Sequence, residues 1–465
     1  MELENVDEHS IEDSEHPEDS TSIMQDEETG SNEKESKDVG PDGLPIENKP
    51  GEEESKEEEE ETPPLRVKRF ATIMNCLNSL LGAGILGVPH ALSYCGLVPS
   101  LIMLVIMAIL SHIGAVMTMK LAIRKNVDSL DELATSILGR WGGIAISIGT
   151  MLFCISCMTS YIVIGFGTLA SWFDAGGIDV DDTLWKRAVV TLIYFVLLPM
   201  PLTFPRSIKF LSPFSTATFI AVVIFVIAMI VKAGIMLPYP AGQKPEITVS
   251  KMGMGIFSAI SIYGLAFAMP VVILPLVKPY NPSSWKRSLI SFWTALFGLV
   301  FVSVPGVIGY CLFGNDSKDV ILDNFSSKDA LIIVVRVGFF IVVTCSFPCI
   351  GQSVMAAWSA VIFGTSDQGS LPLAKRSVVL VLTNIIPLAF AIFLPRAGPA
   401  LSIGGAFGGC LVDFFFPAIM WMKLSKKKLY HWQNILCILF AIFGLVSCAI
   451  ATYQAIVDAI DAFSN

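Results

Sequence analysis

The sequence has little charge for its length. Of its 465 residues only 15% are charged, whereas 53% are hydrophobic, and the mean hydropathy is +0.65. A soluble globular chain usually carries about 25% charged residues, so this composition excludes an ordinary soluble protein. The apolar residues come in runs of about 20, which is the length needed to cross a bilayer. The sequence therefore predicts an all-α polytopic membrane protein.

Residue patterns for metal or covalent chemistry are also missing. The chain has five histidines, and no group of His, Cys, Asp or Glu in or beside the apolar runs has the spacing of a metal site or a catalytic cluster. Nearly all of the ten cysteines fall inside apolar runs, where small buried residues are expected. We therefore expect no enzyme, no cofactor and no disulfide framework; Cys95 and Cys311 are the one pair close enough to the outer face to meet.

Acidic charge is concentrated at the N-terminus. Residues 1–65 contain 25 of the 41 acidic residues and four of the 31 basic ones, a net charge of −21, so residues 66–465 carry +11. The segment lacks aromatic residues and apolar periodicity, and it cannot bury enough surface to offset its ordering entropy. It has neither the basic start nor the apolar core of a signal peptide. Residues 1–65 are predicted to be a disordered cytosolic tail; a regulatory or trafficking segment with unknown partners is the alternative.

Eleven apolar stretches have the length of transmembrane helices. They run roughly over residues 70–93, 97–122, 142–173, 187–204, 211–233, 252–276, 288–313, 330–360, 376–394, 398–422 and 433–457. With residues 66–69 inside, 18 Lys and Arg residues flank the cytosolic ends and eight flank the other side. This bias predicts a cytosolic N-terminus and an outer C-terminus.

Two spans contain residues that interrupt a helix in the middle of the bilayer. Span 1 has Gly82, Gly84, Gly87 and Pro89 within eight residues. Glycine loosens the helix and proline removes a donor, and irregular backbone is tolerated in a membrane only where protein covers it or a cavity adjoins it. Free amides at the start of the outer half-helix would attract a carboxylate. The alternative is a glycine face for close helix packing.

Span 6 has the matching feature, since Gly264 lies in mid-span and Pro270 follows within two turns. Spans 1 and 6 are the first of two five-span sets, roughly 70–233 and 252–422, and because five is odd the sets have opposite orientations. An inverted repeat with paired broken helices is typical of secondary transporters with a midplane site. We expect one transport domain over residues 66–457, in which 433–457 is an additional helix, followed by a short outer C-terminus, 458–465.

The span 1 residues resemble a known family. The run from Asn75 to Pro89, with the pattern Asn-x-x-Asn-x-x-x-Gly-x-Gly-Ile-Leu-Gly-x-Pro, is similar to the first-helix motif of the amino acid/auxin permease family. That family includes sodium-coupled neutral amino acid transporters and vacuolar amino acid transporters. Weaker matches are Gly309–Gly314 at the end of span 7, and Arg336 with Ser346–Pro348 in span 8. The resemblance covers roughly residues 66–457.

The resemblance implies a leucine-transporter-like fold and symport of an amino acid with Na⁺ or H⁺. By position, the substrate carboxylate would meet the amides near Gly82, Ala83 and Gly84, and the substrate side chain would face Tyr263, Gly264 and Ala266. Asn78 in span 1 and Thr344 in span 8 match positions associated with sodium. Their amide and hydroxyl oxygens are hard ligands, although the Thr344 hydroxyl could instead bond to its own helix.

This sequence departs from the sodium-coupled members at one point. Those members usually have a His-Pro pair late in span 6, where Pro270-Val271 stands in this chain. The coupling ion and the subfamily are therefore left open.

Asp413 is the only carboxylate clearly within a span. Ionisable residues inside a membrane are expensive and are functional candidates by default. A proton or gating carboxylate is one interpretation, and a buried partner of a lysine or hydroxyl is the other. Arg336, near the outer end of span 8, is expected to pair with a loop acid such as Asp323 or Asp329.

Together these features predict a secondary active transporter, most simply for neutral amino acids, coupled to Na⁺ or H⁺ by alternating access. An amino-acid-sensing receptor or scaffold that signals through the N-terminal tail is the alternative. The partners are the amino acid and the lipid bilayer, with no nucleic acid. The chain is expected in the plasma membrane or a vacuolar or lysosomal membrane.

Overall fold

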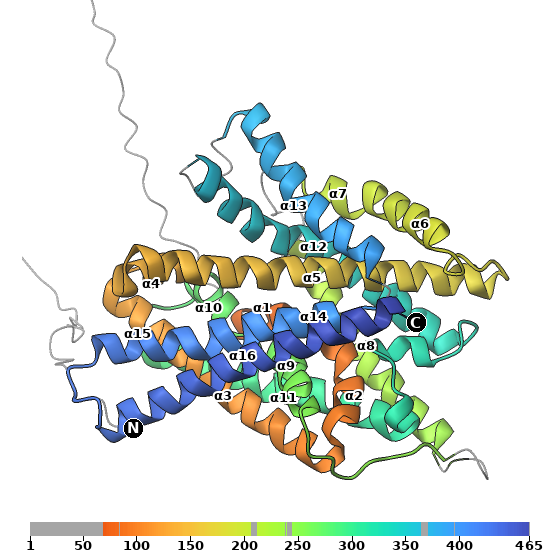
Figure 1. The fold of residues 1–465 in the computed structure, drawn as a ribbon, viewed down its shortest axis with the longest axis horizontal. Coiled ribbons are helices and arrows are strands. Elements are labelled where there is room, and N and C mark those ends of the chain that lie inside the picture. Colours follow the sequence, from red (N-terminus) through yellow and green to blue (C-terminus); the bar gives the residue numbers. More distant parts are fainter. Residues whose placement is uncertain are drawn as a thin grey trace, which may run out of the picture. The chain divides into compact units, whose positions relative to one another are not determined.

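The computed structural model describes residues 68–464 apart from positions 83, 206–211, 238, 240–243, 364–370 and 395. The predicted tail, residues 1–65, therefore lies outside the described residues. Throughout the described part of the chain the regular secondary structure is helical. Figure 1 shows the helices with the labels used below.

Ten helices or near-continuous helix runs are long and apolar enough to cross a membrane, counted over the described residues. They are α3 (Leu97–Lys125), α5 (Arg140–Ala175), α6 (Leu184–Leu197) with α7 (Pro199–Leu202), α8 (Ser212–Met236), α9 (Gly255–Ala266) with α10 (Pro270–Val277), α11 (Ser284–Phe313), α12 (Ala330–Phe363), α13 (Leu373–Phe393), α14 (Gly398–Gly404) with η4 (Gly405–Phe415) and α15 (Phe416–Leu424), and α16 (Trp432–Ser464).

The eleventh span is broken. Helices α1 (Arg69–Leu80) and α2 (Gly84–Cys95) meet at an angle of 56°, and together they are long enough to cross. Three short elements lie in the connections: α4 (Leu130–Leu138), η2 (Gly314–Asp316) and η3 (Ile321–Asn324). The eleven predicted spans are thus present, and we keep their numbers 1–11. Following the predicted orientation, we call the side that carries η2 and η3 the outer side.

Three spans form the core of the helical bundle. The apolar windows of α5, of α9–α10 and of α14–α15 are 83%, 78% and 72% buried, whereas those of α6–α7 and α8 are each 28% buried. A helix that is apolar all round and buried belongs to the interior, and one whose apolar side chains stay exposed in the isolated chain faces lipid. Spans 3, 6 and 10 are therefore central.

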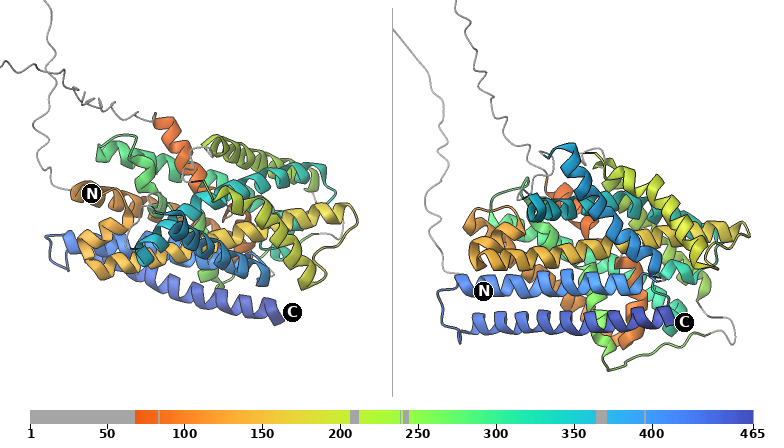
Figure 2. Two further views of the ribbon diagram at one scale, coloured as in Figure 1. Left: turned by 90° about the horizontal axis from the view of Figure 1, so that it is seen from above. Right: turned by 45° about the horizontal axis from the view of Figure 1, so that its top comes forward.

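Two of the central spans, α5 and the α14–α15 run, are enclosed by neighbouring helices. Helix α5 packs against α12, α13, α14 and η4, and it crosses the view between these elements (Figure 1). The α14–α15 run lies beside α16 along its length (Figure 2). The additional helix thus covers span 10, the last span of the second five-span set.

A backbone contact joins the two sets on the outer side. Gly96 has φ of +86°, a conformation that side chains disfavour, and it makes the tight turn between α2 and α3. The next two amides, of Leu97 and Val98, donate to the carbonyls of Thr248 and Val249 in the connection before α9, each at 3.0 Å. Nearby, Cys95 lies 3.1 Å from the Ser100 hydroxyl, and all ten cysteines are free.

Candidate functional site

The break in span 1 lies where the glycines predict it. Helix α1 ends at Leu80, and α2 begins again at Gly84. Gly82 lies within the break, and Ala83 lies outside the described residues. The first amides of α2 have no partner within their own helix. Together with the helix dipole, they offer an anion the positive end of a half-helix.

Span 6 is interrupted in the same way as span 1. Helix α9 ends at Ala266 and α10 begins at Pro270, whose missing N–H suits the first helical position. Two side chains from other spans bind the freed backbone groups. The Ser111 hydroxyl of α3 donates to the Phe267 carbonyl, and the Asp413 carboxylate accepts from the Val271 N–H with 3.1 Å between Oδ1 and N. The break is therefore held by hydrogen bonds from both neighbouring spans.

The two breaks lie against each other. A Cβ atom added at Gly84 would lie 3.3 Å from both the N and the Cα of Ala266, and 3.4 Å from Leu265 Cγ. A side chain at position 84 would fit only if the neighbouring backbone moved by a few tenths of an ångström, so glycine allows the close approach. The structure thus brings together Gly84 and Ala266, two of the residues that the resemblance assigns to substrate.

Gly264 and Tyr263 face other neighbours. The open side of Gly264 points at Gly409 of η4, whose Cα would lie 3.2 Å from an added Cβ. The approach is even closer from the other side, since a Cβ at Gly405 or Gly409 would overlap the backbone of Ser261 or Gly264. Tyr263 is completely buried. Gly264 therefore joins span 6 to span 10, and its open side is not turned toward Gly84.

Tyr161 was not predicted from the sequence. This residue of α5 is buried, and its hydroxyl oxygen lies 2.9 Å from the position that a Cβ would take at Gly82. A single tyrosine among apolar and small residues, Cys157-Met-Thr-Ser-Tyr161, is the sequence signal that could have pointed to it. It adds a hydroxyl donor from span 3 to the break in span 1.

The predicted ion ligands have different environments. Asn78 Oδ1 is buried and has no hydrogen-bond partner in the described part of the chain. Such an orphaned amide oxygen fits a hard cation. The Thr344 hydroxyl lies 3.0 Å from the Tyr194 hydroxyl of α6, so it pairs with another span and not with its own helix. No hydrogen bond of the described side chains connects Asn78 directly to Thr344.

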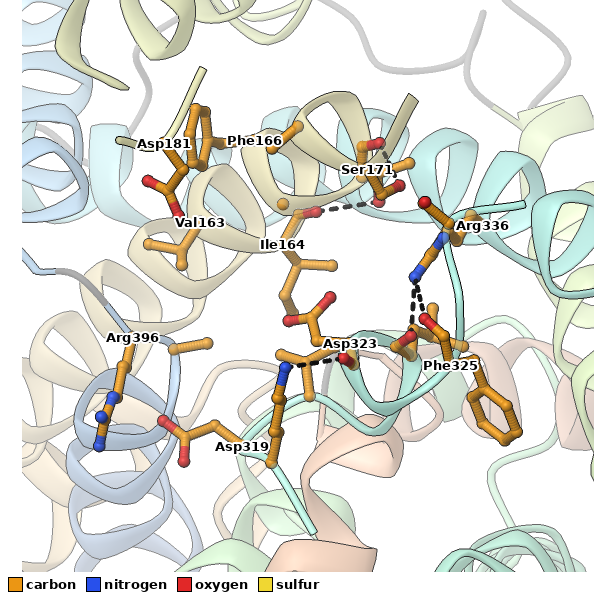
Figure 3. A pocket seen from close by; sticks show the side chains of 18 of the residues that line it. Val163, Ile164, Phe166, Ser171, Asp181, Asp319, Asp323, Phe325, Arg336 and Arg396 are labelled. Carbon is orange, nitrogen blue, oxygen red and sulfur yellow. Dashed lines mark hydrogen bonds between the residues drawn. The ribbon is translucent and has the colours of Figure 1, made fainter. Parts of the chain in front are cut away.

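An outer vestibule is the largest feature that sequence analysis missed. It is a cavity of about 930 Å³ between the outer ends of α2, α5, α12 and the η2–η3 connection (Figure 3). Its lining carries both signs of charge: the acids Asp174, Asp179, Asp181, Asp316, Asp319 and Asp323, and the bases Arg187, Lys318, Arg336 and Arg396. These residues come from separate connections, so no local sequence pattern indicates that they meet.

Arg336 helps to shape the vestibule. Its Nη2 donates to the carbonyls of Leu322 and Phe325, at 2.9 and 3.2 Å (Figure 3). The side chain is 3% exposed, so a buried guanidinium of span 8 orders the η3 loop. Among the described residues Arg336 forms no ion pair with Asp323, whose carboxylate its charge influences, and Asp329 pairs with Lys232 of α8, so the expected pairing of Arg336 with a loop acid is not seen.

The loop carboxylate Asp323 has a shifted acidity. Its side chain faces the cavity and is reached by water, yet the enclosing protein removes much of its hydration. This desolvation raises the pKa of Asp323 to about 6, against the opposing charges of Arg336 and Lys318. The vestibule therefore contains a carboxylate whose pKa the surrounding protein raises above its usual range.

Asp319 connects two spans across the vestibule. One oxygen, Oδ1, lies 3.2 Å from His90 Nε2 on α2, and the other accepts from the Gly398 N–H of α14 at 3.0 Å. His90 Nδ1 lies 2.6 Å from the Ser317 carbonyl. We call His90, Asp319 and Gly398 the outer clamp. It ties the outer half of span 1 to the beginning of span 10.

Known proteins resemble the chain over most of this domain. A family model described as transmembrane amino acid transporter protein matches residues 67–457. The amino acid transporter AVT6E of Arabidopsis thaliana is 26% identical over 77% of this chain and 76% of its own length. The putative sodium-coupled neutral amino acid transporter 11 of Danio rerio is 23% identical over 80% and 82%. The putative transporter 10 of Xenopus laevis is 25% identical over 84% of this chain but only 38% of its own length.

A solved structure shows the fold. The crystal structure of MhsT in complex with L-phenylalanine matches 84% of this chain and all of that chain, with a TM-score of 0.52 and 12% identity. The predicted leucine-transporter-like fold is therefore confirmed. Since the identity is low, this match shows how the helices are arranged but says nothing about which ligand this chain binds.

Proposed function

Because the chain belongs to the transmembrane amino acid transporter family, we propose that it is a secondary active transporter that moves a neutral amino acid by alternating access. The family is one of transporters, so the chain is not an enzyme. The transport unit is residues 66–457, built from the repeats 70–233 and 252–422 and the additional helix. The names of the relatives AVT6E and sodium-coupled neutral amino acid transporter 11 support an amino acid as substrate.

The observation that carries the proposal is the meeting of the two breaks. Gly84 at the start of α2 lies against Ala266 at the end of α9, in the interior of the bundle. Unwound backbone in the middle of a membrane exposes amides and carbonyls that a polar substrate can bind. A packed span has no such groups to offer.

Each side of the break has a role. The amides near Gly82, Ala83 and Gly84 hold the substrate carboxylate, and the Tyr161 hydroxyl donates beside them. On span 6, Ala266 lies against Gly84 and faces the rest of the substrate, and the neighbouring Tyr263 and Gly264 pack behind it, Gly264 against Gly409. Residues 75–89 and 258–273 contain no charged residue. A neutral side chain is therefore favoured, since nothing in these segments neutralises a charged one.

The coupling ion is Na⁺ or H⁺. Asn78 Oδ1, which has no partner among the described residues, and the Thr344 hydroxyl are the candidate sodium ligands. Asp413 is the candidate proton site. An ion favours the substrate-competent state only by binding it better than the other state. No covalent step is required.

Alternating access follows from the two sets of spans. A bundle of spans 1, 2, 6 and 7 rocks against spans 3, 4, 8 and 9, and the outer clamp closes the vestibule. A cavity lined by acids and bases suits the approach of a zwitterion, whose two charges both find partners there. We place the N-terminus in the cytosol, in a plasma, vacuolar or lysosomal membrane.

The test is uptake into proteoliposomes that contain the purified full chain. Tritiated L-alanine, L-leucine and L-glutamine are supplied singly, with Na⁺ or with choline in its place, at pH 5.5 and 7.5. We expect saturable uptake of at least one of them, and its ion dependence names the driving ion. Counterflow of labelled against unlabelled amino acid distinguishes transport from sensing. Binding without counterflow would favour the receptor alternative.

A further inference from the structure

Asp413 lies at the contact between span 10 and the break in span 6. Its side chain is completely buried, and it belongs to η4, a π-helical stretch in the middle of the span. Oδ1 accepts the Val271 N–H at the first turn of α10. On the opposite side, Gly114 of α3 leaves room for the Asp413 carbonyl, which would lie 2.4 Å from an added Cβ. One carboxylate therefore caps the inner half-helix of span 6.

The second carboxylate oxygen is left without a partner. Oδ2 is buried and has no hydrogen bond, and no Lys or Arg of the described chain lies within 4 Å of either oxygen. A buried unpaired charge is expensive, so burial favours the protonated acid. The amide and dipole at the start of α10 favour the anion. These opposing influences suit a group that takes up and releases a proton.

The other titratable groups around η4 are poorer candidates than Asp413 for binding a proton. On the elements packed against η4, the titratable residues include Cys410 of η4 itself, Cys448 of α16, Cys154 and Cys157 of α5, Tyr263 of α9, His112 of α3 and Lys423 of α15; α5 and α16 also carry Asp174 and Asp458 near their C-terminal ends. The cysteines and Tyr263 are buried neutral groups. His112 Nδ1 is bound to the Ser291 hydroxyl at 2.9 Å, and Lys423 forms no ion pair with Asp413. Asp413 is the buried carboxylate among them.

We propose that Asp413 binds the transported proton and that its charge controls the cap on α10. The ionised carboxylate accepts strongly from Val271 and fixes the first turn of the inner half-helix. Proton binding converts it to a neutral, weaker acceptor, which frees α10 to tilt. The proton enters from the side where substrate binds and leaves on the other side, so one proton moves with each substrate. This inference rests on the proposed function and names its coupling ion.

The variant Asp413→Asn distinguishes proton binding by residue 413 from its hydrogen bond to the Val271 N–H. Asparagine has the same shape, keeps an oxygen for the Val271 N–H, and cannot titrate, so it imitates the neutral acid. In proteoliposomes with equal Na⁺ on both sides and an alkaline interior, wild type should accumulate the amino acid active in the uptake assay. The variant should lose this accumulation by at least tenfold while keeping counterflow within about threefold of wild type.

Two controls isolate the site. Asp182→Asn changes an exposed carboxylate paired with Lys186 at 2.6 Å and should leave accumulation unchanged. His112→Gln removes the imidazole of α3, an element that packs against η4, and should also leave accumulation unchanged. Accumulation that survives in Asp413→Asn, or is lost only in His112→Gln, would overturn the assignment.

A measurement on wild type alone keeps the proposal testable if the variant fails to fold. A pH-sensitive dye trapped inside the vesicles should report acidification when the active amino acid is added outside. Counterflow without any proton movement would disprove proton coupling at Asp413. Absence of counterflow in wild type would instead contradict the proposed transport function, so the two failures are distinguishable.

Discussion

His90 Nε2 lies 3.2 Å from Asp319 Oδ1, and this pair joins the outer half of span 1 to the loop that shapes the vestibule. Because the second oxygen of Asp319 accepts a hydrogen bond from the Gly398 amide, one carboxylate contacts both span 1 and span 10. A group that bridges two otherwise separate elements couples their motions. The outer clamp is therefore the contact to remove in order to open this side of the protein.

Asp319→Ala should release the outer clamp. Loss of its two contacts, each worth about 1 kcal/mol, should raise access to the vestibule by roughly thirtyfold. Ser171 of α5 also lines the vestibule. A cysteine introduced there as Ser171→Cys, in a chain with Cys311 replaced by serine, reports this access through its rate of modification by an impermeant thiol reagent. Asp182→Ala serves as the control, and an unchanged rate in Asp319→Ala would rule out a gating role for the clamp.

Gly84→Ala should reduce uptake about tenfold, and Gly84→Leu should abolish it. The new Cβ of alanine meets the Ala266 backbone at 3.3 Å and shifts it by a few tenths of an ångström, whereas the larger leucine side chain must push the half-helices apart. Gly234→Ala is a matched control, because an added Cβ there meets no atom within 4 Å. Uptake is compared at equal amounts of protein in the membrane. Normal uptake by Gly84→Leu would disprove the site.

Tyr161→Phe should raise KM for the amino acid by about tenfold, which corresponds to the loss of one hydrogen bond to a charged group, roughly 1.5 kcal/mol. The reason is the position of its hydroxyl beside Gly82, at the break in span 1. The apolar ring remains, so we expect the unfolding temperature to change little. Tyr453→Phe removes a hydroxyl from an exposed tyrosine and should leave KM as it is. Equal KM values for both variants would argue against a role for Tyr161 in binding.

Asp323→Asn should change how stability depends on pH. The folded pKa of about 6 lies above the value of about 3.9 expected in the unfolded chain. Between these values the folded state holds a proton that the unfolded state has lost, so wild type gains stability as the pH falls from 7 to 5. The variant lacks this gain. Thermal unfolding in detergent at several pH values measures the difference, and parallel curves would contradict the pKa of Asp323.

The breaks in the helices could be predicted from sequence because their causes are local. Gly82 and Gly84 lie at the break in span 1 and Pro270 begins the inner half of span 6, whereas Gly87 and Pro89 lie inside the continuous helix α2. The structure confirms that spans 1 and 6 are interrupted within a leucine-transporter-like fold. The assignment of individual residues to substrate and ion stays a prediction.

The partners across the bundle could not be predicted. Tyr161 lies 79 positions from Gly82, and Asp319 lies 229 from His90, so no periodicity relates them. Asp413 could be recognised as an unusual membrane carboxylate, but its hydrogen bond to Val271 depends on the packing of span 10 against span 6. Packing also turns the open side of Gly264 toward Gly409. These relationships arise only when distant helices are placed together.

The glycine contacts between spans 6 and 10 limit how the protein can move. An added Cβ at Gly405 would lie 1.7 Å from the Ser261 carbonyl oxygen, and one at Gly409 would lie 2.2 Å from the Gly264 carbonyl carbon. Two backbones this close have no intervening side chains that could change rotamer to permit a shear motion. We therefore expect span 10 and the outer half of span 6 to move as one rigid piece, with any bending of span 6 confined to residues 267–269, between Ala266 and Pro270.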